Sequence, residues 1–545
     1  MSKIRVNLIF LLCLSTFSFI RADGLSNKIN KLLKSQDEIE QNEIIKQIIE
    51  KQPSVDDLIN TLKNIEFAKP DKFGVILKEN QCVDGIARPY FLYVPQNYDH
   101  KTKMPLIVYL HGGVSRKDLI NNKEFADAIR EHPFTKMADE YGYLLIFPLG
   151  QSEATWWDSV GISNVLQQIR NTKQDYNIDD NRIFMTGFSD GGSGSFLFAM
   201  CYPTDFAGFL PLNGHPGVGS EAGEIQAYFV NLFNRPIYVV NTDEDALYPA
   251  EKEIRPTMEL AHKAGAHIFY RIYAGIGHDF DYAEEEMPRM ARFMESNSRS
   301  LNPTIKWESA YPGLGCTWLV IDAITEEGHA DWYEDHNMKL IEDRVMFGFY
   351  ADDEYEGLDP GVLDKSIMSQ YFPDEDYKGP GVRIDKIIGD STLCAMVGME
   401  EGDVIIKLGD IPVRTIEDVS KYKEGKECGD SAEIVILREN QILEFEGYFP
   451  GPTEYDLFTR GKPSCRIEGY FSANKFSFRT SQVGAFTLYI HPDMVQLDQN
   501  VVVEVNGEIV FDEKVEVYPE FILRNFLENR DRALIYVNKV AILLK

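Results

Sequence analysis

From Arg88 to His278 the chain alternates short runs of strand-forming residues with helical segments. The strand candidates share many β-branched and aromatic residues, and they read PYFLYVP, PLIVYLHGG, YLLIFPLG, RIFMTGFS, GFLPLNG, PIYVVNTDED and IFYRIYAGIGH. Such runs, separated by helices, predict a mainly parallel sheet covered on both faces. In an open sheet of this kind, active sites lie at the carboxyl ends of the strands. The stretch TGFSDGGSG, from Thr186 to Gly194, stands at such an end and continues into the helical segment GSFLFAMCY.

The stretch TGFSDGGSG contains the pattern G-x-S-x-G, with Gly187 and Gly191 on either side of Ser189. Small flanking residues allow a sharp turn from strand to helix, which exposes the serine hydroxyl as a nucleophile. Because the pattern is short, the alternative is a polar serine in a flexible glycine-rich loop. Whether Ser189 is a nucleophile or a loop residue therefore depends on whether the sequence also supplies its catalytic partners.

A serine nucleophile needs a histidine that accepts its proton and a carboxylate that orients the histidine. On a sheet of this type the three groups follow one another along the chain in the order Ser, Asp or Glu, His. Asp245 follows the strand candidate PIYVVNT, and His278 follows IFYRIYAGIG. The sequence therefore predicts a catalytic triad of Ser189, Asp245 and His278, with Asp243 and Glu244 as alternatives for the acid.

Ester and amide chemistry at a serine also needs two N–H donors for the oxyanion that develops in the transition state. We expect one from the backbone of Asp190, directly after the nucleophile. The other is expected from Gly113, in the turn HGG that follows the strand candidate PLIVYL, because a glycine lets the backbone approach the substrate closely.

Three aromatic residues are candidates for the substrate pocket. Trp156 and Trp157 follow FPLG, and they either wall the pocket or pack in the core. His215 lies in NGHPG after the next strand candidate, where it either lines the pocket or serves as a hydrogen-bonded loop residue.

The motifs of this region carry a resemblance to a known family. RPYFLYVPQNYD, MPLIVYLHGG, YNIDDNRIFMTGFSDGGS and FAGFLPLNGHP resemble the α/β-hydrolases grouped with polyhydroxybutyrate depolymerases and with feruloyl and acetylxylan esterases, and more distantly the catalytic domain of prolyl oligopeptidase. The resemblance covers about residues 70–300 and implies an α/β-hydrolase domain with the triad and oxyanion donors named above. The prolyl-oligopeptidase propeller is missing, which favours an esterase over a peptidase.

Length, charge and cysteine spacing bear on the number of domains, on nucleic-acid binding and on metal sites. A chain of 545 residues with 44% hydrophobic residues is expected to form two to four domains. Its net charge of −31, without a basic block, argues against nucleic acid as a partner. The cysteines are scattered without a C-x-x-C pair, so no metal site is indicated, and triad chemistry requires no cofactor.

Residues 1–22 have the pattern of a secretory signal peptide, with two basic residues before an apolar run from Val6 to Ile20. This run is short for a membrane span. Cys13 raises the alternative of a lipoprotein, but Leu12 stands where a small residue would be needed. We expect an exported protein, secreted or periplasmic, with no membrane span once the signal is removed.

Residues 371–449 resemble a PDZ domain of the bacterial type. KGPGVR resembles the loop whose amides hold a terminal carboxylate, and VRIDKII resembles the strand that a bound peptide extends. The resemblance implies capture of a peptide or protein C-terminus by strand addition, with Gly381, Val382 and Ile384 at the groove. The alternative is an inert spacer that orients the hydrolase.

The remaining segments complete a three-part fold class: an α/β-hydrolase domain, a PDZ domain of α+β type and a small β-sandwich. Residues 23–69 show helical periodicity and are expected to form a cap or brace. Residues 301–370 and 450–545 contain strand candidates, and an Asn-Gly turn marks a hairpin in the second segment. The second segment resembles the β module that follows some secreted bacterial hydrolases, and we expect both segments to form one sandwich around the inserted PDZ domain.

These observations predict an exported serine carboxylesterase that forms an acyl-enzyme. The expected substrate is a short-chain or aromatic ester, including esters carried on polysaccharide. Two alternatives remain: a serine peptidase of the prolyl-oligopeptidase type, and a catalytically silent protein that binds through its PDZ domain. The complete set of catalytic groups argues against the silent protein.

Overall fold

The computed structural model describes residues 24–114, 122–223, 225–326, 328–352 and 381–544. The predicted signal peptide, and the first three residues of the segment KGPGVR, lie outside the described residues. The chain forms two compact units, one of residues 1–338 together with 457–545, and one of residues 339–456. Within the described ranges, no helix is long and apolar enough to cross a membrane.

The first unit contains an eight-stranded sheet in the order β1-β2-β4-β3-β5-β6-β7-β8. Its strands are β1 (Gly74–Gln81), β2 (Ala87–Val94), β3 (Met104–Leu110), β4 (Leu144–Pro148), β5 (Ile178–Phe188), β6 (Gly208–Leu212), β7 (Ile237–Thr242) and β8 (Ile268–Tyr273). All neighbours from β4 through β8 pair in parallel, whereas β1 and β2 pair antiparallel. The predicted mainly parallel sheet is therefore confirmed. β3, β4 and β6 are buried along almost their whole length, and so is β5 from Ile183 to Gly187, which explains their continuous apolar sequences.

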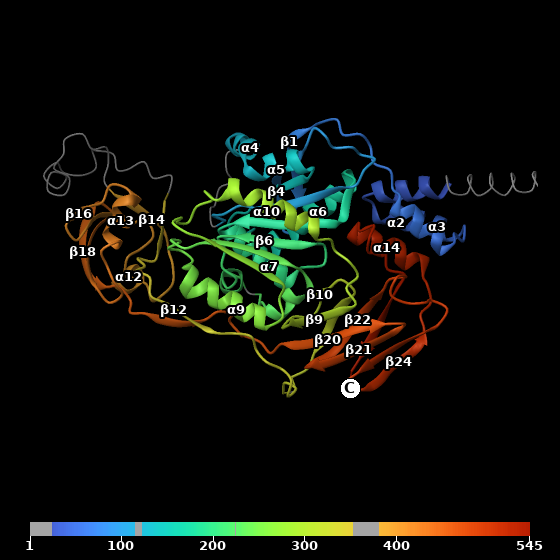
Figure 1. The fold of residues 1–545 in the computed structure, drawn as a ribbon. Coiled ribbons are helices and arrows are strands. Elements are labelled where there is room, and N and C mark those ends of the chain that lie inside the picture. The colour runs from blue at the N-terminus through green and yellow to red at the C-terminus, as the bar shows by residue number, and fades with distance from the viewer. Residues whose placement is uncertain (1–23, 115–121, 224, 327, 353–380, 545) are drawn as a thin grey trace, which may run out of the picture. The chain divides into compact units, whose positions relative to one another are not determined.

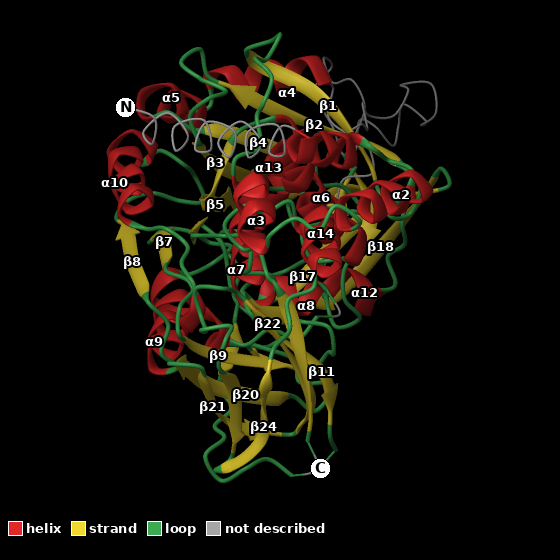
Figure 2. Cartoon of the chain, turned by 90° about the vertical axis from the view of Figure 1, so that its right-hand side faces the viewer, coloured by secondary structure: helices red, strands yellow, loops and turns green. Residues whose placement is uncertain are grey.

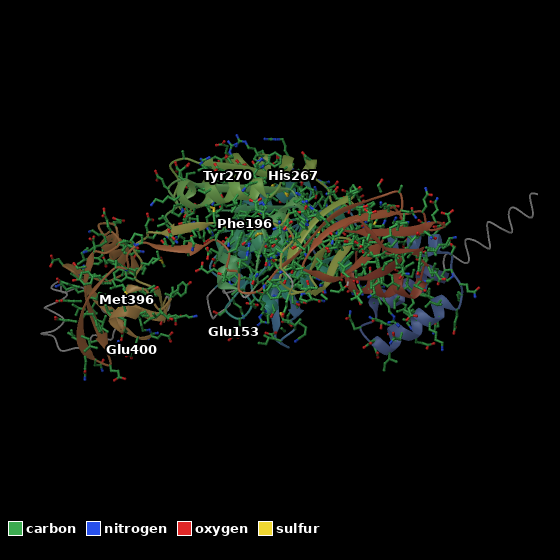
Figure 3. All side chains as sticks on the ribbon, turned by 90° about the horizontal axis from the view of Figure 1, so that it is seen from below. Glu153, Phe196, His267, Tyr270, Met396 and Glu400 are labelled. Atoms are coloured by element: carbon green, nitrogen blue, oxygen red, sulfur yellow. The ribbon has the colours of Figure 1, made fainter. Side chains whose placement is uncertain are left out.

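Helices cover both faces of this sheet (Figure 1). They are α4 (Asn122–Glu131), α5 (Pro133–Tyr141), α6 (Ser159–Asp175), α7 (Asp190–Cys201), α8 (Val218–Ala222), α9 (Arg255–Lys263) and α10 (Ala283–Ser296), with short 3-10 and π turns at Phe229–Asn234 and Ala250–Ile254. Helices α5 and α10 pack together over one core cluster of the sheet. Helix α7 packs on β5 and β6, and its Phe196 is wholly buried inside the domain (Figure 3). The strand before α7 and the helix itself are therefore rigid supports for the turn between them.

The first unit also contains two smaller β-sheets that share one hydrophobic core (Figure 2). One sheet has the order β24-β23-β21-β20-β9 and the other β10-β11-β22-β25. The strands are β9 (Thr304–Ser309), β10 (Gly315–Cys316), β11 (Leu319–Ile324), β20 (Cys465–Ser472), β21 (Lys475–Ser481), β22 (Val483–Ile490), β23 (Asn500–Val505), β24 (Glu508–Lys514) and β25 (Asn538–Leu543). Strands that lie before and after residues 339–456 thus pair within the same sheets, β9 with β20 and β11 with β22.

The N-terminal helices belong to this β module. Helix α2 (Glu38–Ile49) buries Ile44, Ile45 and Ile48 in the core that the two sheets share, and α3 (Val55–Lys63) buries Leu58, Ile59 and Leu62 there. Helix α14 (Pro519–Asn529) contributes to this core from the C-terminal region. The caps follow from the sequence, since Asp37 accepts hydrogen bonds at the start of α2 and Ser54 accepts one at the start of α3.

The second unit begins earlier than the sequence predicts. Its elements are β12 (Lys339–Glu342), β13 (Phe349–Ala351), β14 (Val382–Ile387), α12 (Leu393–Val397), β15 (Val404–Leu408), β16 (Ile411–Pro412), α13 (Ile416–Lys423), β17 (Ser431–Arg438), β18 (Gln441–Tyr448) and β19 (Thr453–Asp456). β12 pairs with β19, and β13 joins the edge of the sheet β13-β14-β15-β17-β18. The unit therefore spans residues 339–456, whereas the sequence suggested a boundary near residue 371.

The predicted peptide groove involves β14. This strand lies between β13, which pairs with Ile384, Lys386 and Ile387, and β15, which pairs with Val382 and Arg383. Val382 is 7% exposed and Ile384 1% exposed, and both lie in the core of the unit. Gly381 has φ +90°, and a Cβ there would lie 2.4 Å from the Ile405 carbonyl oxygen. Peptide binding by strand addition at Gly381, Val382 and Ile384 stays a prediction.

A buried network of charges fastens the C-terminal segment of the first unit to its large sheet. Asp531 lies 2.7 Å from Arg299 and 3.4 Å from Lys173. The next residue, Arg532, donates to the Asp180 carboxylate at 2.9 Å. Burial alone would raise the pKa of Asp531, but Arg299 and Lys173 outweigh it and hold that pKa well below its usual range. The carboxylate therefore stays charged in the folded protein.

We predict that Asp531→Asn destabilises the first unit by about 3 kcal/mol, because it leaves Arg299 and Lys173 buried with less compensating charge. Urea unfolding followed by circular dichroism measures the change. Asp498→Asn is the matched control, since Asp498 is exposed in the same β module. Equal stability of the two variants would contradict a role for the network in holding the segment.

Candidate active site

Ser189 lies on a strained turn between β5 and α7. It has φ +59° and ψ −120°, a conformation that costs a non-glycine residue about 1–3 kcal/mol. Its backbone N–H donates to the Leu212 carbonyl oxygen at 3.0 Å. A Cβ on Gly191 would lie 1.9 Å from the Leu110 carbonyl oxygen, and one on Gly187 would lie 2.5 Å from the same oxygen. Both glycines are therefore required by close packing against β3, and Ser189 is part of a fixed turn.

His278 connects Ser189 to Asp245. The Ser189 Oγ lies 2.8 Å from His278 Nε2, and His278 Nδ1 lies 2.7 Å from Asp245 Oδ2. Because an ionised carboxylate only accepts hydrogen bonds, Nδ1 carries the proton and Nε2 is left to accept the serine proton. This arrangement can activate a serine hydroxyl.

Asp243 and Glu244, the alternatives to Asp245 as the acid of the triad, do not contact His278 through a described hydrogen bond. Asp243 and Glu244 are both exposed, and the Asp243 carboxylate accepts the N–H of Gly275 at 2.7 Å. Asp245 is 2% exposed and is the carboxylate that contacts His278.

Asp245 is held by four hydrogen bonds. Oδ1 accepts the backbone N–H groups of Leu247 and Tyr248 at 2.9 and 3.0 Å. Oδ2 accepts from His278 and from the Asn213 amide, the latter at 3.0 Å. Burial by itself would raise the pKa of Asp245, but the hydrogen bonds from His278, Asn213 and Tyr248 outweigh it and lower that pKa. The carboxylate is thus kept ionised and in one orientation.

Asn213 is a part of the site that sequence reasoning missed. It is fully buried at the end of β6, and its amide nitrogen donates both to Asp245 and to Thr242 Oγ1, at 2.6 Å. Its amide oxygen accepts the Tyr282 hydroxyl at 2.7 Å, which fixes which way the amide faces. The signal in the sequence was an asparagine directly after a buried strand, at the same sheet edge as the triad.

The turn His111-Gly112-Gly113 lies beside Ser189. A Cβ on Gly112 would lie 3.0 Å from the Ser189 Cβ, and Gly113 has φ +69°. The Val114 N–H donates to the Asp190 carboxylate at 3.0 Å, so this donor is already used. Asp190 is the first residue of α7, where no intrahelical bond engages the backbone N–H. The amides of Asp190 and Gly113 stay the proposed oxyanion donors, and the Asp190 side chain additionally ties the turn to the helix.

The side chains of His111 and Trp156 hold the turn His111-Gly112-Gly113 in place through hydrogen bonds. His111 Nε2 accepts the Gly150 N–H at 2.9 Å, so Nδ1 carries the proton and donates to the Gly112 carbonyl oxygen at 2.7 Å. The Trp156 indole N–H donates to the His111 carbonyl oxygen at 2.9 Å. Trp156 is 1% exposed, and a Cβ on Gly194 of α7 would lie 2.7 Å from its Cβ. Of the two interpretations that the sequence allows for Trp156, the structure agrees with a core residue and not with the wall of an open pocket.

Trp157 and His215 are also buried, at 8% and 3% exposure. His215 accepts the Gly217 N–H on Nδ1 at 3.1 Å, and its Nε2 lies 3.6 Å from Glu253. Its ring stacks on Tyr248, which in turn contacts the ring of His278 edge-on. His215 is thus one aromatic layer away from the triad and supports the loop that carries Asp245.

In the parts of the chain that the structure describes, no cluster of three or more His, Cys, Asp or Glu side chains could hold a metal ion.

The strand order, the serine on a sharp turn after β5 and the acid and histidine after β7 and β8 define an α/β-hydrolase. No protein-family model matches the chain. Over 149 residues it is 28% identical to acetylxylan esterase A of Aspergillus oryzae, covering 24% of this chain and 48% of that protein. Over 169 residues it is 27% identical to a bifunctional acetylxylan esterase/xylanase of Neocallimastix patriciarum, covering 30% of this chain and 22% of that protein. The chain spans about half or less of the length of these relatives.

Two solved structures are also similar to a part of the chain. A thermostable esterase matches with 23% identity and a TM-score of 0.33, covering 41% of this chain and 63% of that one. Esterase 2 of Thermogutta terrifontis matches with 16% identity and a TM-score of 0.33, covering 42% of this chain and 96% of that one.

We predict that Tyr282→Phe slows the reaction of Ser189 with a fluorophosphonate probe by roughly tenfold, because the Asn213 amide loses the bond that orients it toward Asp245. The measurement is the labelling rate, followed by mass spectrometry. Tyr518→Phe serves as the control, since Tyr518 is half exposed and its hydroxyl donates to Glu516, far along the chain from the site. An unchanged rate in Tyr282→Phe would show that Asn213 does not depend on this hydroxyl.

Proposed function

We propose that the protein is an exported serine carboxylesterase that works through an acyl-enzyme on Ser189. The observation that carries the proposal is the continuous pair of hydrogen bonds from Ser189 through His278 to Asp245, at 2.8 and 2.7 Å. The strained backbone at Ser189 supports it, because such strain persists at sites where one side chain has to be presented.

In the first half-reaction, His278 Nε2 takes the proton from Ser189 Oγ as the oxygen attacks the ester carbonyl carbon. The carbonyl oxygen becomes an oxyanion, which the N–H groups of Asp190 and Gly113 are proposed to bind. Asp245 stabilises the imidazolium without taking up the proton itself. The tetrahedral intermediate then collapses: the bond to the leaving alcohol breaks, and His278 returns the proton to the alcohol oxygen.

In the second half-reaction, water replaces the alcohol. His278 takes a proton from the water, whose oxygen attacks the acyl carbon bound to Ser189, and the same amides bind the second oxyanion. Collapse of this intermediate breaks the bond to Ser189 Oγ, which recovers its proton from His278. The products are a carboxylic acid and the free enzyme, so the cycle needs no metal or redox partner.

The proposed substrates are short-chain or aromatic esters, including acyl groups on polysaccharide. Support comes from the relatives, since both are described as acetylxylan esterases and both match a part of this chain. The N-terminal pattern of a signal peptide agrees with a substrate outside the cytoplasm. Acetylated xylan is therefore the first polymer to test.

We predict that the full chain, after removal of the signal, hydrolyses p-nitrophenyl acetate and releases acetate from acetylated xylan. Ser189→Ala is expected to lose at least about 10³-fold in kcat, because the nucleophile is gone. Ser296→Ala is the control, since Ser296 is exposed at the end of α10. Labelling by a fluorophosphonate should map to Ser189 and be absent from Ser189→Ala.

The other outcomes of this experiment separate the alternatives. Faster turnover of peptide amides than of esters would identify a serine peptidase. A folded sample that neither reacts with the probe nor hydrolyses any ester would identify a binding protein, and the esterase proposal would be rejected.

A further inference from the structure

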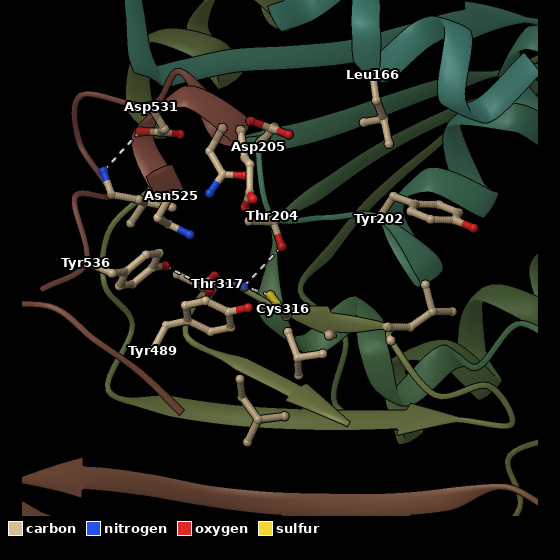
Figure 4. A pocket seen from close by; sticks show the side chains of 18 of the residues that line it. Leu166, Tyr202, Thr204, Asp205, Cys316, Thr317, Tyr489, Asn525, Asp531 and Tyr536 are labelled. Carbon is tan, nitrogen blue, oxygen red and sulfur yellow. Dashed lines mark hydrogen bonds between the residues drawn. The ribbon is translucent and has the colours of Figure 1, made fainter. Parts of the chain in front are cut away.

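A cavity of about 350 Å³ lies in the first unit at the opposite end of helix α7 from Ser189. Its walls come from α6, the end of α7, the β10-β11 hairpin, β22, α14 and the loop that follows α14 (Figure 4). Its volume is within the range of small-molecule sites, roughly 300–1,000 Å³. Helix α7 has 12 residues, so the cavity is about 18 Å from the nucleophile and is a separate site.

Several polar side chains that line this cavity have no hydrogen bond or ion pair within the described parts of the chain. They are Arg170, Tyr202, Tyr489 and Asn525. Asn525 is the most informative, because it is only 6% exposed and its amide has donors and an acceptor to satisfy. Buried polar groups normally have partners, so the Asn525 amide points to a polar ligand or to water in the cavity. Arg170, Tyr202 and Tyr489 are partly exposed and can contact the same ligand.

The charges of the walls limit what the ligand can be. Asp205 accepts from Lys173 at 2.7 Å, and Asp531 pairs with Arg299 at 2.7 Å, so both carboxylates are already neutralised. Arg170 and the exposed Glu528 add one charge of each sign to the lining. Because acidic and basic groups balance, the cavity favours a neutral polar ligand over a phosphate or another strong anion.

Two aromatic rings complete the lining. Tyr202 and Tyr489 lie on opposite sides of the view in Figure 4 and come from α7 and β22 regions that are far apart in the sequence. Burial raises the pKa of both phenols, so both hydroxyls stay protonated and can donate as well as accept. Rings with a polar edge suit ligands that have an apolar face and a rim of hydroxyls.

We propose that this cavity binds a neutral saccharide. The hydroxyls of a sugar match the mixture of donors and acceptors offered by Asn525, the two tyrosines, Arg170 and Glu528, while its ring faces match the tyrosine rings. The proposal goes beyond the esterase activity and does not depend on it, because none of these residues contacts Ser189, Asp245 or His278 through a described hydrogen bond.

The test is isothermal titration calorimetry of the full chain, after removal of the signal, with xylotriose, cellotriose and mannotriose at about 10 mM. We expect at least one of them to bind. Asn525→Leu and Tyr202→Phe should each weaken that binding by about tenfold, because each removes a hydrogen bond from a desolvated site. Tyr518→Phe should bind as the unchanged protein does.

Three results would overturn the proposal. They are the absence of binding for all three sugars, binding that both variants leave unchanged, and binding that is lost when Ser189 is blocked by a fluorophosphonate. Thermal unfolding of each variant checks that it is folded, and Tyr202→Phe removes a single half-buried hydroxyl if Asn525→Leu fails to fold. Hydrolysis of p-nitrophenyl acetate, measured in parallel, reports separately on the esterase proposal.

Discussion

The close approach of α7 to β3 is the constraint on which the site depends. Gly187 and Gly191 bring the backbone against the Leu110 carbonyl oxygen, at distances that leave no room for a Cβ. This contact forces the chain through a left-handed conformation at Ser189 and places the turn after β3 beside it. The strain is supported by the hydrogen bond from Ser189 N–H to β6 and by the burial of α7 from Gly191 to Cys201. The parallel sheet then brings Asp245 and His278 to the same edge, since both follow the carboxyl ends of strands.

The sheet and the triad residues could be predicted from the sequence because each has a local signal. Buried parallel strands are continuous apolar runs, and the order serine, acid, histidine follows from the topology. Asn213 and the carboxylate of Asp190 could not be predicted in their roles, because a single polar residue in a loop has many uses. Asn213 contacts Asp245, and the Asp190 carboxylate contacts the Val114 N–H. Both contacts join loops that are far apart in the sequence and form only in the folded protein. Trp156 was ambiguous for a similar reason, since a core indole and a pocket indole look the same in sequence.

The second unit shows a different limit of sequence reasoning. Val382 and Ile384 alternate with polar residues as expected for a strand, but this pattern does not tell a central strand from an edge strand. The partner that occupies the edge, β13, has three residues and is separated from β14 by a long segment. The start of the unit at residue 339 has no clear signal in the sequence, because β12 and β13 are too short to show a periodic pattern.

The pairing of β9 with β20 and of β11 with β22 has a consequence for synthesis of the chain. The first members of both pairs end by Ile324, and their partners begin at Cys465, so these strands cannot complete their sheets until the whole inserted unit has left the ribosome. The large sheet, by contrast, has all eight of its strands by Tyr273. During translation β9 and β11 therefore lack their partners β20 and β22. Closing the long loop between these strands costs conformational entropy, which is offset only when the β module has folded completely. Asp531 and Arg532, which fasten that module to the hydrolase sheet, are synthesised after β9, β11, β20 and β22.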